Sequence, residues 1–513
     1  MKEIVRTGMD RRGLWRALVL AAMLCSAGAS PANAAGPSAG AAGLGDRLNP
    51  GIGNGGYDVQ DYDLRLRYAT SDPDQELQGD ETIVARATQA LSQFNLDFGG
   101  KSLGAVSVNG QAASFKRTGE ELIIKPASPI ANGSTFTVLI TDFTAAPTKI
   151  TWAVDSVAFF VTPDGSATAP QPYDAHLVYP CNDHPRDKAT FTFTIDVPAG
   201  HDAIANGTEI GHFTSNGRTV WTYRMNHPMA TELTQIAVGD WDFSPTVQHG
   251  NVAIRNATAP AITAAVQPVL DLTESQLDWM EARVGPYPFD TYGTLIVNAP
   301  LFLQMETQTI MLTYAGILDR ADRPRAFWDP ALVHELAHQW FGDSVSPYSW
   351  SDYWLNEGHA MWYMLTYADE TGQLEGDTAG GWPDPQGYAT LDELMRAVYA
   401  HGDEWRKQSG PVALPKSGGV IKLSSLQVYD GGALVLYALR QKIGDAPFDQ
   451  VERTWVTRYR DSVASTDDFI ALATEISGDQ TVTPFLRDWL YGQKTPPMPG
   501  HPDWIVNPVG SIR

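Results

Sequence analysis

The feature that most constrains this chain is the five-residue run His334-Glu335-Leu336-Ala337-His338. On an α-helix two histidines four residues apart lie on one face, so both imidazoles can bind one zinc ion. Asp329 and Pro330 precede the run as an N-cap and a first helical residue, and Gly342 follows it at the place of a C-terminal cap. The sequence therefore predicts a helix of about three turns that carries a zinc site, with Glu335 directed toward a metal-bound water.

A third zinc ligand is predicted at Glu357, which begins a second apolar helical stretch that runs to Gly372. Two neutral histidines and one carboxylate leave the fourth zinc position open for water, which is typical of a catalytic site and not of a closed structural one. We expect one Zn²⁺ per chain, bound by His334, His338 and Glu357. His359 follows Glu357 by two residues and projects about 200° away around the helix axis, so we predict a packing or supporting role for it.

The composition excludes several other classes of protein. Lys and Arg number 36 against 59 Asp and Glu, and the net charge of −23 would repel nucleic-acid phosphates and anionic lipid surfaces. The two cysteines, Cys25 and Cys181, are too few for a disulfide framework or a thiolate zinc site. We therefore expect no nucleic-acid partner, and a metal bound by histidines and carboxylates.

Residues 1–34 have the order of a cleaved secretory signal peptide. Basic residues precede an apolar stretch from Ala17 to about Leu24, and small residues end at Ala32-Asn33-Ala34. The apolar stretch is too short to span a bilayer, which needs about 20 residues. Arg11-Arg12 leaves open whether export uses the general or the twin-arginine route. We expect a secreted, extracellular protein without a stable membrane anchor.

Hydrophobic periodicity divides the remaining chain. Residues 35–56 are rich in Gly, Ala, Pro and Asn and lack an apolar period, which predicts a flexible N-terminal segment. Alternation of period two, as in 62–68, 136–140 and 191–197, predicts an antiparallel β-domain over 57–244. A helical stripe over 269–284, ended by Gly285-Pro286, opens a mainly helical domain over 245–499, and 500–513 is a C-terminal tail.

Several motifs together resemble a known family. Residues 334–343 and 354–358, with Gly285-Pro286-Tyr287-Pro288-Phe289, residues 180–185 and residues 489–492, are similar to the zinc aminopeptidases of the aminopeptidase N and leukotriene-hydrolase family, which are gluzincins. The resemblance covers residues from about 55 to about 499. It implies a multi-domain fold, β then α+β: a saddle-like antiparallel β-domain followed by a thermolysin-like, mainly helical zinc catalytic domain.

The resemblance also assigns roles to individual residues. Glu306 falls on the family's glutamate that binds the substrate's α-ammonium, Gln171 on a second anchor of that amine, and Met305 near the first side-chain pocket. Only Met305 and Glu306 of the family's Gly-Ala-Met-Glu-Asn motif are retained, which leaves the preferred N-terminal residue open. Glu335 would act as general base and then general acid, and Tyr429 would stabilise the oxyanion with zinc.

Three functions from different classes follow. The first is a secreted zinc aminopeptidase that cleaves N-terminal residues from peptides with a free N-terminus through a zinc-bound water. The second is an endopeptidase or another zinc hydrolase, such as an epoxide hydrolase, on the same scaffold. The third is a non-catalytic peptide-binding relative. Because the chain ends at Arg513, we further expect a two-domain enzyme whose open site accepts peptides of varied length. The oligomeric state stays open.

Overall fold

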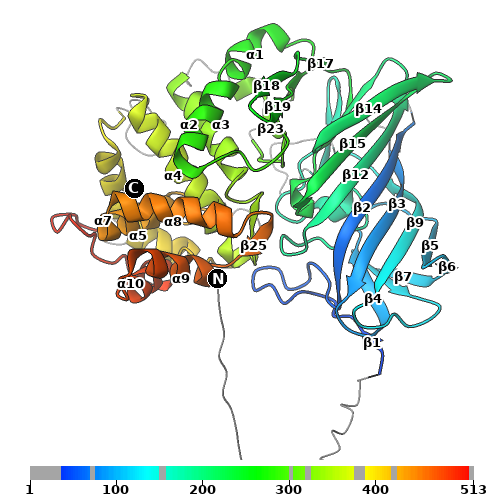
Figure 1. Cartoon of the computed structure of the whole chain (residues 1–513), viewed down its shortest axis with the longest axis horizontal. Coiled ribbons are helices and arrows are strands. Elements are labelled where there is room, and N and C mark those ends of the chain that lie inside the picture. Colours follow the sequence, from blue (N-terminus) through cyan, green and yellow to red (C-terminus); the bar gives the residue numbers. More distant parts are fainter. Residues whose placement is uncertain are drawn as a thin grey trace, which may run out of the picture. The chain divides into compact units, whose positions relative to one another are not determined.

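The computed structural model describes residues 36–69, 76–148, 158–299, 304–317, 325–374, 387–417 and 424–507. The described residues from Pro37 onward belong to one compact unit. Strands dominate the first half of the chain and helices the second (Figure 1). This order confirms the prediction that a β-rich region is followed by a helical one. The predicted signal peptide lies outside the described residues.

The largest sheet has eight strands in the order β14-β15-β12-β2-β3-β9-β5-β6. The three stretches that alternate in the sequence form β2, β9 and β12, and every second side chain of each is buried. Most neighbours run antiparallel, as predicted, but β2 and β12 pair in parallel, with Leu64 opposite Phe193. The bounds are β2 (Tyr57–Tyr68), β3 (Leu77–Ala87), β5 (Ala105–Val108), β6 (Gln111–Ala112), β9 (Thr135–Ala145), β12 (Ala189–Pro198), β14 (Thr208–Ser215) and β15 (Arg218–Met229).

Smaller sheets complete the β-structure. Two four-stranded sheets have the orders β1-β4-β8-β7 and β10-β11-β16-β13, and a third, β17-β20-β22-β23, leads into the helical region. Their bounds are β1 (Ser38–Ala39), β4 (Leu91–Asp97), β7 (Ser114–Thr118), β8 (Glu121–Lys125), β10 (Phe159–Thr162), β11 (Gly165–Thr168), β13 (Asp202–Ala205), β16 (Ile236–Gly239), β17 (Asp242–Phe243), β20 (Ala257–Thr258), β22 (Thr294–Val297) and β23 (Met311–Tyr314). A three-stranded sheet contains β18 (Val247–His249), β19 (Val252–Ile254) and β21 (Thr291–Tyr292). A two-stranded sheet pairs β24 (Val345–Pro347) with β25 (Ser462–Ala464).

The segment before β2 is ordered against the rest of the unit. Strand β1 pairs with β4, the Asp46 carboxylate accepts hydrogen bonds from the backbone N–H groups of Leu48 (2.7 Å) and Trp350 (2.8 Å), and Arg47 donates to the carbonyl oxygen of Pro415 (2.6 Å). The prediction of a flexible segment over 35–56 is therefore wrong for residues 37–56. Polar groups, and not an apolar period, fix this segment in place.

The helical region begins with two helices where the sequence predicts one. Helix α1 (Thr263–Leu270) and helix α2 (Thr273–Val284) are separated at Asp271 and Leu272, and α2 ends at Gly285, whose φ of 108° favours glycine. The other α-helices of the described residues are α3 (Arg325–His338), α4 (Trp354–Glu370), α5 (Leu391–Ser409), α7 (Asp430–Ile443), α8 (Asp445–Arg458), α9 (Thr466–Ser477) and α10 (Val482–Tyr491). Within these residues, no helix is long and apolar enough to cross a membrane.

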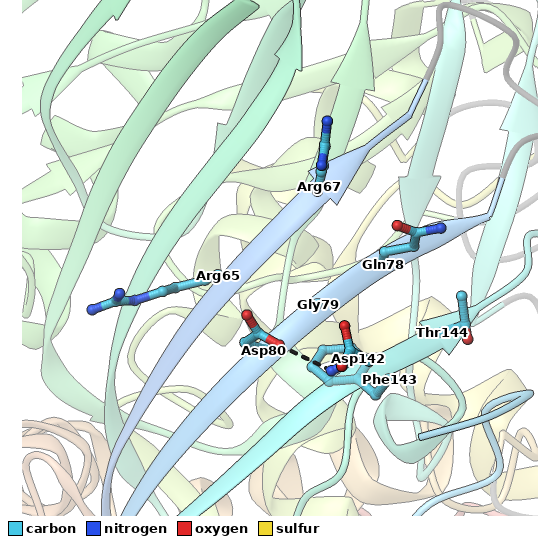
Figure 2. Close-up of a pocket in the computed structure, with 8 residues that line it drawn as sticks. All are labelled: Arg65, Arg67, Gln78, Gly79, Asp80, Asp142, Phe143 and Thr144. Carbon is cyan, nitrogen blue, oxygen red and sulfur yellow. Dashed lines mark hydrogen bonds between the residues drawn. The ribbon is translucent and has the colours of Figure 1, made fainter. Parts of the chain in front are cut away.

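Helix α4 lies in the core, because residues from Trp354 to Leu365 are buried without interruption and α3 and α7 pack against it. A pocket of about 310 Å³ lies elsewhere, on the eight-stranded sheet. Figure 2 shows Arg65, Arg67 and Asp80 from β2 and β3 among its lining residues, and Asp80 accepts a hydrogen bond from the backbone of Asp142. None of the sequence-predicted site residues lines this pocket.

Candidate zinc centre

Helix α3 carries the two histidines and is longer than the sequence predicts. It begins at Arg325, so Pro330 lies inside the helix and Asp329 does not cap it. The Asp329 carboxylate is buried and accepts hydrogen bonds from the Gln276 amide (2.9 Å) and the Tyr367 hydroxyl (3.1 Å). Asp329 thus connects α3 to α2 and α4. The predicted cap is wrong because the helix begins four residues before Asp329, whose carboxylate binds residues distant in sequence.

The three predicted zinc ligands meet at one point. The His334 Nε2 atom lies 3.2 Å from the Glu357 Oε2 atom and 3.2 Å from His338 Nε2, and His338 Nε2 lies 3.5 Å from Glu357 Oε2. Zinc bonds of about 2.0–2.2 Å in a tetrahedron require donor atoms about 3.3–3.5 Å apart. The donor set and its spacing therefore fit a zinc ion, with α3 supplying the histidines and α4 the carboxylate.

The surroundings of His338 favour a cation. Glu306, Glu335 and Glu357 are all buried and close to it, and Glu306 and Glu335 each offer an oxygen within 4.8 Å of the His338 ring nitrogen. Burial raises the pKa of Glu335 well above its usual range, and the charges of Glu306 and Glu357 add to that rise. The pKa of Glu357 is lowered despite its burial, because His338 and His334 stabilise its charge. A divalent cation would offset this concentration of buried negative charge.

Backbone contacts orient the His338 ring. Its Nδ1 atom lies 3.2 Å from the carbonyl oxygen of Phe341, the geometry in which Nδ1–H donates and Nε2 is left to bind metal. The His334 Nδ1 atom is buried without a hydrogen-bond partner among the described residues.

Glu306 and Gln171 lie side by side although they are 135 residues apart in the chain. The Gln171 amide donates a hydrogen bond to the Glu306 carboxylate, whose Oε1 atom lies 4.0 Å from His338 Nδ1. Glu306 is only 3% exposed. The structure therefore brings the two residues that the resemblance assigns to amine binding next to the zinc ligands.

Gln339 positions the Glu306 segment, and the sequence did not single it out. Its amide nitrogen donates to the carbonyl oxygen of Glu306 (3.1 Å), and its amide oxygen accepts from the Thr309 backbone (2.8 Å) and the Tyr287 hydroxyl (2.9 Å). Gln339 directly follows His338 in the sequence, and this position was the one signal that could have indicated its role. Met305, by contrast, is fully buried and pairs with Leu312 through its backbone. This burial does not support the predicted role of Met305 in a side-chain pocket.

Tyr429 immediately precedes α7 and faces the zinc ligands. Its ring stacks on His334, with centroids 6.0 Å apart and planes at 11°. Its hydroxyl interacts with Glu357 and with Tyr353, a buried tyrosine that also interacts with Glu357 and that sequence reasoning missed. Burial raises the pKa of Tyr429 well above 10, so the hydroxyl keeps its proton and can donate.

His359 packs away from the ligand set. It is fully buried, its Nδ1 atom lies 2.8 Å from the carbonyl oxygen of Leu355, and its ring stacks on Phe341 at 4.4 Å between centroids. It belongs to none of the groups of side chains that could hold a metal ion among the described residues. This placement agrees with the packing role predicted for it.

Comparison with known proteins identifies a protein family that this chain resembles in both regions. The model of the peptidase family M1 domain matches residues 269–489, and the model of the peptidase M1 N-terminal domain matches residues 59–233. Leucine aminopeptidase 2 of Yarrowia lipolytica is 27% identical over 452 residues, which cover 84% of this chain and 66% of that protein. Aminopeptidase N of Haemonchus contortus is 27% identical over 341 residues, or 62% of this chain and 33% of that one. The chain thus matches less than two thirds of the length of these relatives.

One solved structure is similar to this chain in both the β-rich and the helical region. The M1 zinc metallopeptidase of Deinococcus radiodurans, in a mutant bound to a Tyr-Ser-Ala substrate, is 28% identical with a TM-score of 0.74. The similarity covers 90% of this chain and 100% of that one. Both halves of the fold, and not the zinc helix alone, are therefore shared.

Proposed function

Because this chain belongs to peptidase family M1, with a zinc cofactor, we propose that it is an aminopeptidase that removes N-terminal residues from peptides. The observation that carries the proposal is the Gln171–Glu306 pair, 4.0 Å from a zinc ligand. A buried carboxylate at that distance pairs well with the α-ammonium of a substrate whose first peptide bond lies at the zinc, because charge-assisted hydrogen bonds are strong in a dry site.

The residues around the ligands fit hydrolysis. When bound, zinc supplies Lewis-acid polarisation of the scissile carbonyl and of the attacking water. Glu335, buried beside the metal ligands, would accept the proton of that water and pass it to the leaving nitrogen. Tyr429 keeps its proton and donates a hydrogen bond to the carbonyl oxygen as negative charge develops there.

The same pair of residues argues against an endopeptidase. A peptide that continued past the first residue would bring no ammonium group to Glu306 and would leave its buried charge without a cation. A non-catalytic peptide-binding role leaves the position of Glu335 without purpose, since Glu335 is not needed to bind the metal. These arguments favour the aminopeptidase over both alternatives.

The test compares substrates that differ only at the amine. The zinc-loaded protein should cleave Leu-p-nitroanilide and hydrolyse Leu-Gly-Gly, but not the N-acetylated forms of either. Glu306→Ala should lower kcat/KM for the free amine by about 10²–10⁴, the scale on which buried charge pairs act. Glu393→Ala, on the exposed first turn of α5, should change nothing. Equal cleavage of acetylated peptides would refute the assignment.

We also propose that the protein is secreted, on the basis of the signal-like order of residues 1–34. N-terminal sequencing of the protein recovered from the culture medium of an expressing bacterium should begin at or near Ala35. Retention in the cell with Met1 intact would refute secretion without affecting the proposed activity.

A further inference from the structure

A lysine of the β-rich region binds the backbone just beyond the helix that carries the two zinc-binding histidines. Lys188 directly precedes β12 and is half-buried. Its Nζ atom donates hydrogen bonds to the backbone carbonyl oxygens of Asp343 (2.6 Å), Ser344 (2.9 Å) and Ser462 (3.4 Å). An ammonium group has three N–H donors, so these three contacts use all of them. All three acceptors lie in the helical half of the chain.

Two of these acceptors belong to the turn after α3, which comprises residues 339–344. Helix α3 ends at His338, and the backbone N–H of Asp343 donates to the carbonyl oxygen of His338 (3.0 Å). The carbonyl oxygen of Phe341, in the same turn, lies 3.2 Å from His338 Nδ1. Lys188 therefore holds the turn whose carbonyl group orients a zinc ligand.

The charge of Lys188 strengthens its contacts with the turn after α3. Hydrogen bonds from a charged donor are about twice as strong as those from a neutral one. Burial lowers the pKa of Lys188 to about 8, while the charges of Asp461, Asp343 and Glu232 oppose that fall. Lys188 is therefore mostly protonated near pH 7. Three charge-assisted donors thus act on backbone carbonyl groups that neutral groups would hold less firmly.

The turn after α3 keeps other hydrogen bonds when the Lys188 ammonium is removed. The Ser346 hydroxyl also donates to the Asp343 carbonyl oxygen (3.2 Å), and the Ser462 backbone N–H donates to that of Ser344 (3.1 Å). Each of these two carbonyl oxygens would therefore retain one donor. We expect the fold to persist in such a variant while the position of the turn becomes less fixed.

We propose that Lys188 is a positioning residue for the zinc centre, which acts through the turn after α3 on the ring of His338. None of its three acceptors is a zinc ligand, so the action is indirect. Replacement of residues that orient a metal ligand from outside typically costs about 10–100-fold in metal affinity or activity. Metal binding in the helical region thus depends on a side chain of the β-rich region. This inference rests on the zinc cofactor of the family and not on the proposed substrate.

The test measures the zinc Kd of the full-length protein by competition with a chelator, together with the Tm of its zinc-free form. Lys188→Met keeps most of the side-chain length without an N–H donor and should raise the zinc Kd about 10–100-fold. Lys188→Arg keeps the charge and the donors and should bring the Kd to within about threefold of the unaltered protein. The matched control is Arg186→Met, because the Arg186 guanidinium donates to the Leu44 carbonyl oxygen (2.8 Å) and not to the turn after α3. Its Kd should stay within twofold.

A residue that only joins the two regions would give a different result. Lys188→Met would then lower the Tm of the zinc-free protein and leave its zinc Kd within twofold, which would overturn the proposal. Zinc binding by Lys188→Arg as weak as that of Lys188→Met would also overturn it. Should Lys188→Met not fold, Lys188→Gln retains neutral donors and should raise the Kd at least threefold, and an unchanged Kd would count against the proposal. Since peptide cleavage is not measured, the proposed function can fail independently.

Discussion

Helices α4 and α7 meet through two glycines, and this contact gives a prediction about the position of Tyr429. A Cβ atom added at Gly358 would lie 2.9 Å from the Cα atom of Gly432 and 3.0 Å from its carbonyl carbon. Carbon atoms prefer about 3.5–4.0 Å, so Gly358→Ala must separate the helices by about 0.5–1 Å. Both contacted atoms belong to backbone, and no change of rotamer can relieve the overlap.

The expected loss of stability from Gly358→Ala is small. Overpacking costs about 1–3 kcal/mol, while alanine in place of glycine in a helix returns about 0.5–1 kcal/mol. The free energy of unfolding should therefore fall by roughly 0–2.5 kcal/mol, which lowers Tm by a few degrees in a large chain.

The effect on catalysis should be larger. Glu357 lies on α4 next to Gly358, and Tyr429 immediately precedes α7. Separation of the helices therefore moves the Tyr429 hydroxyl relative to the zinc ligands, and a displacement of about 1 Å can cost about 10²-fold in rate. We expect kcat to fall about ten- to a hundredfold with little change in zinc content.

The assay measures kcat, KM, zinc content and Tm for Gly358→Ala and for Gly432→Ala, whose Cβ atom would lie 2.7 Å from the Cα atom of Gly358. Gly431→Ala is the matched control on α7, because the three atoms nearest to its Cβ atom would all belong to the side chain of Gln427 and not to the backbone of α4. Turnover of Gly358→Ala within twofold of the unaltered enzyme would refute the reasoning.

Three more predictions concern the metal, the base and pH. Glu335→Gln should keep zinc, measured by mass spectrometry, while kcat falls about 10²–10⁴-fold; loss of the metal would contradict its assignment as a base. Glu357→Ala should lose zinc and activity together, since one of three protein ligands is gone; a variant that retains stoichiometric zinc would exclude Glu357 as a ligand. Burial opposes protonation of His176, but its hydrogen bond to Asp183 (2.6 Å) and the charge of that carboxylate outweigh burial and raise its pKa to about 9. The folded state thus binds the proton more tightly, so the stability from this pair is complete below about pH 6.5 and is lost as pH rises toward 9. The Tm difference between the unaltered protein and His176→Gln should shrink over that interval, and a difference that is constant or grows would contradict it.

Strand periodicity could be predicted from the residues alone, whereas contacts between distant residues could be predicted only where a motif or the family resemblance supplied them, as for Gln171 and Glu306. The alternating stretches became β2, β9 and β12 because burial of every second side chain is a property of the strand itself. The start of α3 could not be inferred in this way. Asp329 has the residue type of a cap, but its carboxylate binds Gln276 and Tyr367, from 53 and 38 residues away. The same holds for Asp46, whose partner Trp350 is 304 residues away.

The acidic surplus shows where composition alone misleads. A net charge of −23 is most simply explained by a solvated surface, yet Glu306, Glu335 and Glu357 are all at least nine-tenths buried. Burying three carboxylates near one point is unfavourable unless cations neutralise them. A zinc ion bound by the two histidines and Glu357, and a substrate ammonium beside Gln171, would supply such neutralisation. The physical argument therefore connects the metal and the amine in one site: each helps to offset a charge that the folded chain would otherwise leave uncompensated.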